Sequence, residues 1–150
     1  MIAWRICKQR HPVFDGTGAA LVGARWNSAG RPVIYAAECL AGSLLEIIAH
    51  ALRPRTLPGP HHGVRIDIPD GLAVETLEPA ALPGWELPGS PTAREFGDRW
   101  FDEQRTPVLL VPAVTSRPVG RNVLINPLHP SANQLTVSSA FAVPWDERLF

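Results

Sequence analysis

The stretch from Gly23 to Ala51 constrains the fold most, because its pattern predicts a loop, a strand and an apolar helix in direct succession. The helix is expected over Cys39–Leu52, which reads CLAGSLLEIIAHAL and contains Glu46 as its only acidic residue. A carboxylate among apolar residues is costly to bury unless a partner or a chemical task keeps it there. Glu46 is therefore the first candidate for a functional residue.

The neighbours of Glu46 allow two interpretations. At helical spacing Gly42, Ser43, Ala49 and His50 lie one turn away. Gly42 and Ala49 are small, and would leave room for a ligand above the carboxylate. The alternative is a surface glutamate paired with His50.

Two upstream residues extend the candidate site. Arg25 lies in the sequence GARWN, where Trp26 and Asn27 could help to shape a ligand-facing turn. The alternative for Arg25 is a surface salt bridge. Tyr35 is the only tyrosine and falls in a strand predicted over Arg31–Ala37. The alternative for Tyr35 is a core aromatic residue whose hydroxyl is satisfied within the protein.

The rest of the chain predicts an α+β domain. A second helix is expected over Pro91–Gln104, where Ser90 offers an N-cap and Pro91 the first helical position. A long loop is expected over His11–Gly30, and a Pro/Gly connector over Arg53–Gly63. Further strands are expected at Met1–Cys7, Val64–Ile68, Val108–Val114 and Asn122–Asn126. The order of these elements favours a mixed, mostly antiparallel sheet with flanking helices, in one domain spanning residues 1–150.

Composition argues against several classes of protein. The formal net charge is +0, from 14 basic and 14 acidic residues without clusters, so no nucleic-acid-binding surface is expected. No apolar run reaches the roughly 18 residues of a membrane span, and the amino terminus lacks a signal-peptide pattern. Cys7 and Cys39 show no CxxC spacing, and two buried free thiols in a reducing cytoplasm are expected. We therefore expect a soluble cytoplasmic protein.

Metal and common nucleotide motifs are missing from the sequence. The histidines show neither HExxH nor HxxxH spacing, and His61 and His62 are expected to be exposed in the connector. There is no GxGxxG fingerprint and no P-loop. We therefore expect no metal, and an arginine rather than a glycine-rich loop as the holder of any phosphate.

Taken together, these segments resemble the RES domain, a bacterial toxin family named for arginine, glutamate and serine. The resemblance spans nearly the whole chain and rests on the order and spacing of several short motifs. The motifs that carry it are Trp4-Arg5-Ile6, Phe14–Ala19, Gly23–Asn27 followed by Gly30, Pro32–Glu38, Leu44–Glu46, Val111-Pro112, Asn122–Pro130 and Asp146–Leu149.

The resemblance implies a fold similar to ADP-ribosyltransferases and an activity on NAD without a metal. It implies a toxin of a bacterial toxin–antitoxin system that cleaves NAD at the nicotinamide–ribose bond by hydrolysis or phosphorolysis. A helix-turn-helix (Xre-like) antitoxin is the implied partner, and a homodimer within a larger complex is a further alternative. Carried over by position, the catalytic residues are Arg25, Tyr35 and Glu46, and Trp26, Asn27 and Arg5 join Arg25 and Tyr35 in binding NAD.

The sequence departs from the family pattern at two positions. Ala24 stands where the second glycine of the turn is usual, and Ala113 stands where the family has serine after Val-Pro. Ser116 is a candidate substitute. Two alternatives therefore stay open: a protein ADP-ribosyltransferase, and a catalytically weak member that acts mainly by binding its antitoxin.

The expected chemistry follows from the bond that breaks. Loss of nicotinamide builds positive charge on the ribose, as in glycoside hydrolysis. We expect Glu46 to stabilise that charge and the Tyr35 ring to stack on nicotinamide. Arg25 would hold the pyrophosphate through charge-assisted hydrogen bonds.

Overall fold

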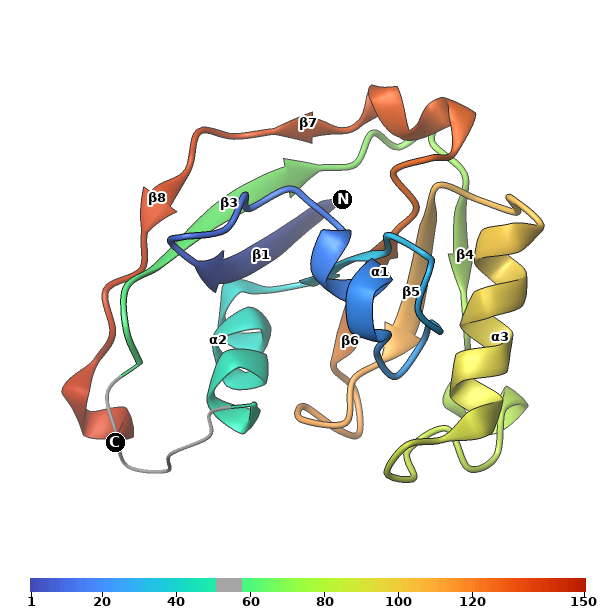
Figure 1. The fold of residues 1–150 in the computed structure, drawn as a ribbon, viewed down its shortest axis with the longest axis horizontal. Coiled ribbons are helices and arrows are strands. Elements are labelled where there is room, and N and C mark those ends of the chain that lie inside the picture. Colours follow the sequence, from blue (N-terminus) through green and yellow to red (C-terminus); the bar gives the residue numbers. More distant parts are fainter. Residues whose placement is uncertain (51–57) are drawn as a thin grey trace.

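The computed structural model describes residues 1–50 and 58–150 of the chain. Its strands form one curled sheet in the order β4-β5-β6-β2-β1-β3-β7, with β8 also paired to β3 (Figure 1). The β4–β5 pair is parallel and the other pairs are antiparallel. The strands are β1 (Ile2–Lys8), β2 (Ile34–Ala37), β3 (His61–Asp67), β4 (Val74–Thr76), β5 (Val108–Pro112), β6 (Arg121–Ile125), β7 (Thr136–Val137) and β8 (Phe141–Ala142). The α-helices are α1 (Thr17–Val22), α2 (Leu40–Ala49) and α3 (Pro91–Asp102), and short 3-10 turns occupy Pro79–Ala81, Pro130–Gln134 and Glu147–Leu149. This arrangement confirms the predicted α+β class with a mixed, mostly antiparallel sheet.

Two apolar clusters lie on opposite faces of the sheet. Successive side chains of a strand point to opposite faces, and Leu109 and Leu110 accordingly belong to different clusters. Both faces of β5 are thus covered, which explains why its sequence is a continuous apolar run instead of an alternating one. In contrast, β3 alternates between buried Val64 and Ile66 and exposed Arg65, as its sequence pattern predicts.

The helix α3 covers one face of the sheet beside β4 and β5 (Figure 1). Its start confirms the predicted cap, because the Ser90 hydroxyl accepts a hydrogen bond from the Ala93 amide at 3.2 Å and Pro91 takes the first helical position. Ala93 and Trp100 are fully buried on its inner face. The absence of a side chain at Gly97 lets α3 approach the chain at Trp26, since a Cβ there would lie 1.9 Å from the Trp26 carbonyl oxygen.

The helix α2 packs against β1 and β2 with little burial. Among its residues, Ser43 alone is buried, and its hydroxyl donates to the Trp4 carbonyl at 2.7 Å. The expected core residues of this helix, Leu40, Leu44, Ile47 and Ile48, are half-buried, and Ala51, the expected end at Leu52 and the proline beyond it lie outside the described residues. The helix α2 is therefore a partly exposed element at the surface of the fold.

Several local expectations are wrong. The loop expected over His11–Gly30 contains the short helix α1. Strand β3 begins at His61, whose ring is buried against Trp145 with its Nδ1 2.6 Å from the Gly59 carbonyl oxygen, so this histidine is not exposed. The two free cysteines are not buried either. Cys7 is half-buried, and Cys39 is exposed because it caps the start of α2, where its sulfur accepts from the Gly42 amide.

Helices long and apolar enough to cross a membrane are not found among the described residues. Nor does that part of the chain contain a group of three His, Cys, Asp or Glu side chains placed to hold a metal ion.

Candidate active site

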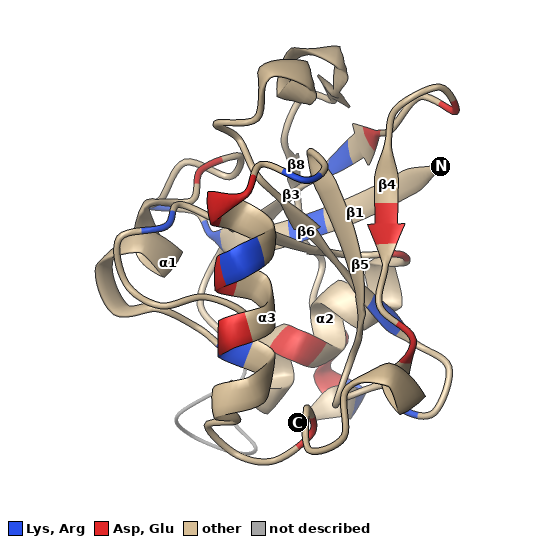
Figure 2. Cartoon of the chain, turned by 90° about the vertical axis from the view of Figure 1, so that its right-hand side faces the viewer, with Lys and Arg blue, Asp and Glu red and all other residues tan. Residues whose placement is uncertain are grey.

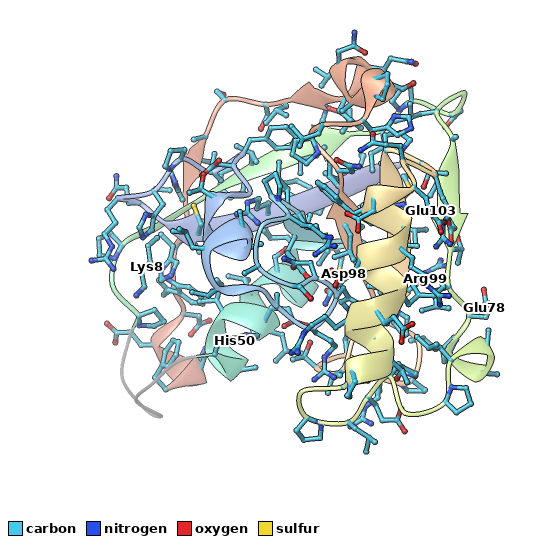
Figure 3. All side chains as sticks on the ribbon, turned by 45° about the vertical axis from the view of Figure 1, so that its right-hand side comes forward. Lys8, His50, Glu78, Asp98, Arg99 and Glu103 are labelled. Carbon is cyan, nitrogen blue, oxygen red and sulfur yellow. The ribbon has the colours of Figure 1, made fainter. Side chains whose placement is uncertain are left out.

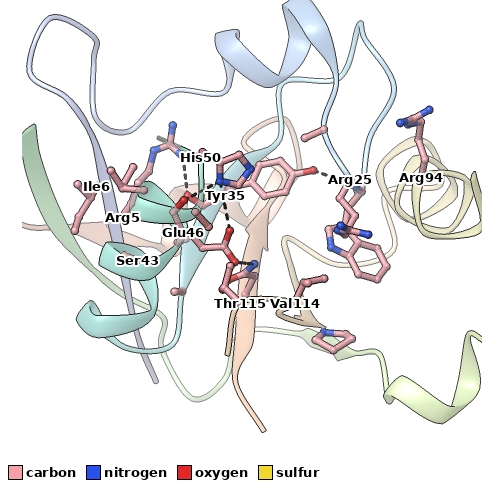
Figure 4. Close-up of a pocket in the computed structure, with 18 of the residues that line it drawn as sticks. Arg5, Ile6, Arg25, Tyr35, Ser43, Glu46, His50, Arg94, Val114 and Thr115 are labelled. Atoms are coloured by element: carbon pink, nitrogen blue, oxygen red, sulfur yellow. Dashed lines mark hydrogen bonds and ion pairs between the residues drawn. The ribbon is translucent and has the colours of Figure 1, made fainter. Parts of the chain in front are cut away.

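A cavity of about 600 Å³ opens between α2, the loop around Arg25 and the loop that follows β5 (Figure 4). Arg25, Tyr35 and Glu46 all line it, so the structure brings the three predicted catalytic residues to one cavity. In the view of Figure 4, Glu46 and Arg25 lie on opposite sides of the Tyr35 ring. Glu46 and Arg5 thus lie toward one end of the cavity, and Arg25 and Arg94 toward the other (Figure 4).

Glu46 projects from α2 with its side chain about a quarter exposed, at 26%. Its Oε1 accepts hydrogen bonds from the Thr115 hydroxyl at 2.7 Å and from the Asn122 amide at 3.1 Å. Its Oε2 lies 3.8 Å from His50 Nδ1, so the pairing proposed as the surface alternative is present as well. Glu46 is thus held from the sheet side through Oε1, and its Oε2 accepts no hydrogen bond from the described residues.

The ring and the hydroxyl of Tyr35 have different surroundings. Its ring lines the cavity, while its hydroxyl donates to Asn27 Oδ1 at 2.7 Å and accepts from the Trp26 amide at 3.2 Å. Burial is the main cause that raises the pKa of Tyr35 far above its ordinary value, although the hydrogen bond from the Trp26 amide and, less strongly, Arg94 and Arg25 oppose this. The phenol therefore stays protonated, and its hydroxyl is satisfied within the protein, as one of the two interpretations of Tyr35 predicts. The ring remains free to contact a ligand.

Asn27 fixes the loop from behind instead of lining the cavity. It is fully buried, and its amide nitrogen donates to the carbonyl oxygens of Ala19, Ser28 and Arg31. Asp98 of α3 points toward the same loop (Figure 3), where it accepts from the Ser28 amide at 2.7 Å and the Ser28 hydroxyl at 2.6 Å. Asn27 therefore has the position of a scaffold residue, and its expected contact with NAD stays a prediction.

Trp26 lies between the loop and the core. It is buried, it stacks on Trp85 with ring centroids 6.2 Å apart, and it contributes to the cavity wall. Next to it, Arg25 donates from Nη1 to the carbonyl oxygens of Trp85 at 2.9 Å and Leu87 at 2.8 Å. These bonds hold the guanidinium at the cavity edge, and among the described residues Arg25 makes no ion pair of the kind that its surface alternative requires.

Arg5 reaches the cavity from β1, but its nitrogens are engaged. They donate to the carbonyl oxygens of Val13, of Tyr35 at 2.6 Å and of Asp15 at 3.0 Å. Burial lowers the pKa of Arg5, and a guanidinium nevertheless remains charged at any ordinary pH. Arg5 therefore connects β1, the segment before α1 and β2 around the cavity.

Sequence reasoning missed several lining residues. Thr115, Asn122 and Arg94 all line the cavity, and Arg94 comes from the first turn of α3 (Figure 4). The expected substitute for the family serine, Ser116, is not among the lining residues, and its hydroxyl lies against Gly120. Ala113 is buried and has no hydroxyl, and the hydroxyl that donates to Glu46 is that of Thr115. For two of the missed residues the sequence contained only a weak signal. Thr115 directly follows one predicted core strand, and Asn122 is the first residue of the next.

The chain matches the family model described as RES domain over residues 2–146. It is 37% identical over 151 residues to "Toxin Res" of Pseudomonas putida, with 100% of both chains covered. It is 35% identical over 154 residues to "Prs ADP-ribosylating toxin" of a Sphingobium species, covering 97% of this chain and 94% of that one. Among solved structures, the toxin–antitoxin complex MbcT-MbcA of M. tuberculosis contains a similar fold, with a TM-score of 0.74 and 22% identity over 95% of this chain and 83% of that one.

Proposed function

The chain belongs to the RES domain family, and from this premise we propose that it is the toxin of a bacterial toxin–antitoxin system that cleaves NAD at the nicotinamide–ribose bond. Hydrolysis and phosphorolysis are the two reactions that we consider first. The observation that carries the proposal is the single cavity lined by Arg25, Tyr35 and Glu46. Its volume of about 600 Å³ falls in the usual range of ligand sites.

Glu46 is the proposed stabiliser of the breaking bond. When nicotinamide leaves, positive charge develops on the ribose, and a carboxylate beside that ribose lowers the energy of the transition state. Nicotinamide departs as a neutral molecule from a cationic ring, so the step needs no strong acid. This suits a cavity in which the only phenol, that of Tyr35, is held protonated by burial, which raises its pKa, and is bonded to the interior.

The opposite end of the cavity suits the phosphates of NAD. Arg25 is fixed by two carbonyl oxygens, and Arg94 lines the same end without a side-chain hydrogen bond or ion pair to any described residue. Two guanidinium groups can bind a pyrophosphate through charge-assisted hydrogen bonds. The Tyr35 ring between the two ends offers a flat surface for nicotinamide, which would orient the reacting bond.

A second candidate function is protein ADP-ribosylation. The Sphingobium relative, named as an ADP-ribosylating toxin for Prs, favours it. The same cavity would then transfer ADP-ribose to a protein side chain instead of to water or phosphate. The third alternative, a weakly active member, is motivated by Ala113 at the position of the family serine.

The proposed partner is a helix-turn-helix antitoxin, in a complex that could hold more than one copy of each chain. The similar M. tuberculosis structure is that of a toxin bound to its antitoxin, which supports a partner of this class. Direct nucleic-acid binding is not proposed, because acidic and basic residues are interspersed (Figure 2) and the net charge is +0. Two free thiols suit the reducing cytoplasm that we propose as the location. Failure to copurify with a helix-turn-helix protein encoded beside it would count against the partner.

The activity is tested by nicotinamide release from NAD. The pure protein is incubated with NAD, with and without phosphate, and then with a cell extract and labelled NAD. Release by the pure protein supports hydrolysis or phosphorolysis, whereas label transfer that needs the extract supports the second candidate. Absence of both would support the weakly active alternative.

Glu46→Gln tests the central residue. Loss of one well-placed electrostatic stabiliser typically costs about 100- to 1000-fold in rate, so this variant should nearly abolish NAD turnover. Glu38→Gln is the matched control, because Glu38 pairs with Arg121 and does not line the cavity. Full turnover by Glu46→Gln would remove Glu46 from the mechanism.

A further inference from the structure

The two oxygens of the Glu46 carboxylate have different surroundings. Oε1 accepts from both the Thr115 hydroxyl at 2.7 Å and the Asn122 amide nitrogen at 3.1 Å. Among the described residues Oε2 has no hydrogen-bond donor, and His50 Nδ1 lies 3.8 Å from it. The Nδ1 of His50 lies closer, at 2.7 Å, to the Glu46 main-chain carbonyl oxygen, which further commits that nitrogen away from Oε2. One oxygen is therefore fixed, and the other is available.

The donors reach Glu46 from other parts of the fold. Thr115 lies in the loop after β5 and Asn122 in β6, 69 and 76 positions from Glu46 in the sequence. The register of the sheet places Asn122 opposite Ala37, shortly before α2 begins. The carboxylate is thus held between the helix and two segments of the sheet side, which restricts a side chain that is otherwise free to rotate about several bonds.

The hydrogen-bond roles are set by chemistry. An ionised carboxylate only accepts, so the hydroxyl of Thr115 must donate its one proton to Oε1, and the nitrogen of Asn122 donates another. Bonds to an ionised acceptor are stronger than those between neutral groups. Because the Thr115 proton is committed to Glu46, this hydroxyl is not a free nucleophile or a free acid.

From this geometry we infer that Thr115 and Asn122 are positioning residues, which hold Oε1 of Glu46 so that Oε2 is the oxygen presented to the ribose. This inference rests on the proposed function. It also assigns to Thr115 the hydroxyl that bonds to Glu46, whereas position 113 carries a buried methyl group. Thr115 acts through Glu46 and does not itself contact the reacting bond.

The test uses Thr115→Val, which keeps the shape of the side chain and removes the donor. Loss of one hydrogen bond to a charged group, with Asn122 still in place, should lower kcat for nicotinamide release by about 10-fold. The Michaelis constant for NAD should change little, because the phosphate end of the cavity is untouched. Thr115→Ser restores the hydroxyl and should recover most of the rate. Asn122→Leu should lower kcat in the same way.

Matched controls separate this effect from general damage. Thr136→Val makes the same change at an exposed position of β7 that does not line the cavity, and should behave as the unchanged protein. Thermal unfolding monitored by circular dichroism establishes that each variant is folded. If Thr115→Val does not fold, the kcat values of Asn122→Leu, which lacks a donor to Glu46, and of Thr115→Ser, which keeps both donors, are compared instead.

A double variant tests whether Thr115 acts through Glu46. In the Glu46→Gln background, Thr115→Val should cost little further, since the carboxylate that it holds is gone. An equal cost in both backgrounds would overturn the inference, as would full kcat in both Thr115→Val and Asn122→Leu when Glu46→Gln is inactive. Absence of NAD turnover in the unchanged protein would instead count against the proposed function.

Discussion

Tyr35 shows how much one side chain contributes to the candidate site. Its hydroxyl joins Asn27 and the Trp26 amide behind the cavity wall, and its ring forms part of that wall. Tyr35 of strand β2 is thereby fixed to two residues of the Arg25 loop, Trp26 and Asn27. The hydrogen bond that Tyr35 donates to Asn27 requires a protonated phenol. Ionisation of Tyr35 should therefore be coupled to unfolding.

Ionisation of Tyr35 can be measured without interference from other tyrosines, because the chain contains one tyrosine. Burial raises the pKa of Tyr35 in the folded protein above its ordinary value of about 10, which the unfolded chain should show. The folded state then binds this proton more tightly than the unfolded state. Its contribution to stability is fully present below pH of about 10 and is lost as the pH rises toward the folded pKa.

We therefore predict that tyrosinate absorbance appears at higher pH in the folded protein than in the denaturant-unfolded chain. The free energy of unfolding should fall above pH of about 10, and less steeply in Tyr35→Phe. Coincident titration curves for the folded and unfolded protein would show that the hydroxyl is not held as described.

The residues of the site were predictable to different degrees. Glu46 stood out as the only acidic residue of an apolar helix, whereas the roles of Arg25 and Tyr35 came from the family resemblance. The structure brings all three to one cavity. Their individual roles stay predictions. Thr115 and Asn122 could not be found, because their bonds to Glu46 span 69 and 76 positions and depend on the sheet register.

At the scale of elements, the packing of α3 determines where the Arg25 loop lies. Gly97 allows the helix to touch the main chain at Trp26, and Asp98 beside it binds Ser28 through both carboxylate oxygens. The helix and its cap were predictable from local signals at Ser90 and Pro91. Its contact with the loop was not, because nothing at Gly97 identifies a partner 71 positions away in the sequence.

Gly97→Ala tests this contact. The new Cβ would meet the Trp26 carbonyl oxygen at 1.9 Å, so helix and loop must separate. Overpacking of this kind costs about 1–3 kcal/mol in the free energy of unfolding. We predict a loss of that size in chemical denaturation, together with a raised Michaelis constant for NAD.

The matched control for this change is Gly18→Ala in α1, where a Cβ would meet no atom within 4 Å. Alanine is the better helix former, so this variant should be as stable as the original protein or slightly more stable. Equal stability of Gly97→Ala and Gly18→Ala would contradict the close approach at Trp26.

For the whole molecule, the fold brings charged residues from distant segments to the cavity. Glu46 comes from the partly exposed helix α2 on one side, while Arg25 and Arg94 come from the loop and helix on the other. The predicted order of strands and helices was sufficient to give the α+β class. It could not place the wall segments around one cavity, since that depends on the non-sequential strand order β4-β5-β6-β2-β1-β3-β7.

A ligand that bridges both sides of the cavity should stabilise the whole fold. With the slow variant Glu46→Gln, which limits turnover, NAD at about 100 times its dissociation constant should add about 2.7 kcal/mol to the free energy of unfolding. Arg25→Ala in the same background should weaken NAD binding and reduce this gain at equal NAD concentration. An undiminished rise in melting temperature would count against Arg25 as a phosphate contact.

Arg5 contributes a positive charge to the cavity lining without forming an ion pair to any described residue. Its guanidinium bonds to three carbonyl oxygens, and among the described residues no carboxylate lies within ion-pair distance of it. Carbonyl dipoles solvate a cation but leave its full unit of charge in place. A polyanionic ligand is therefore attracted before it touches any side chain, and dissolved salt would weaken that attraction by screening it.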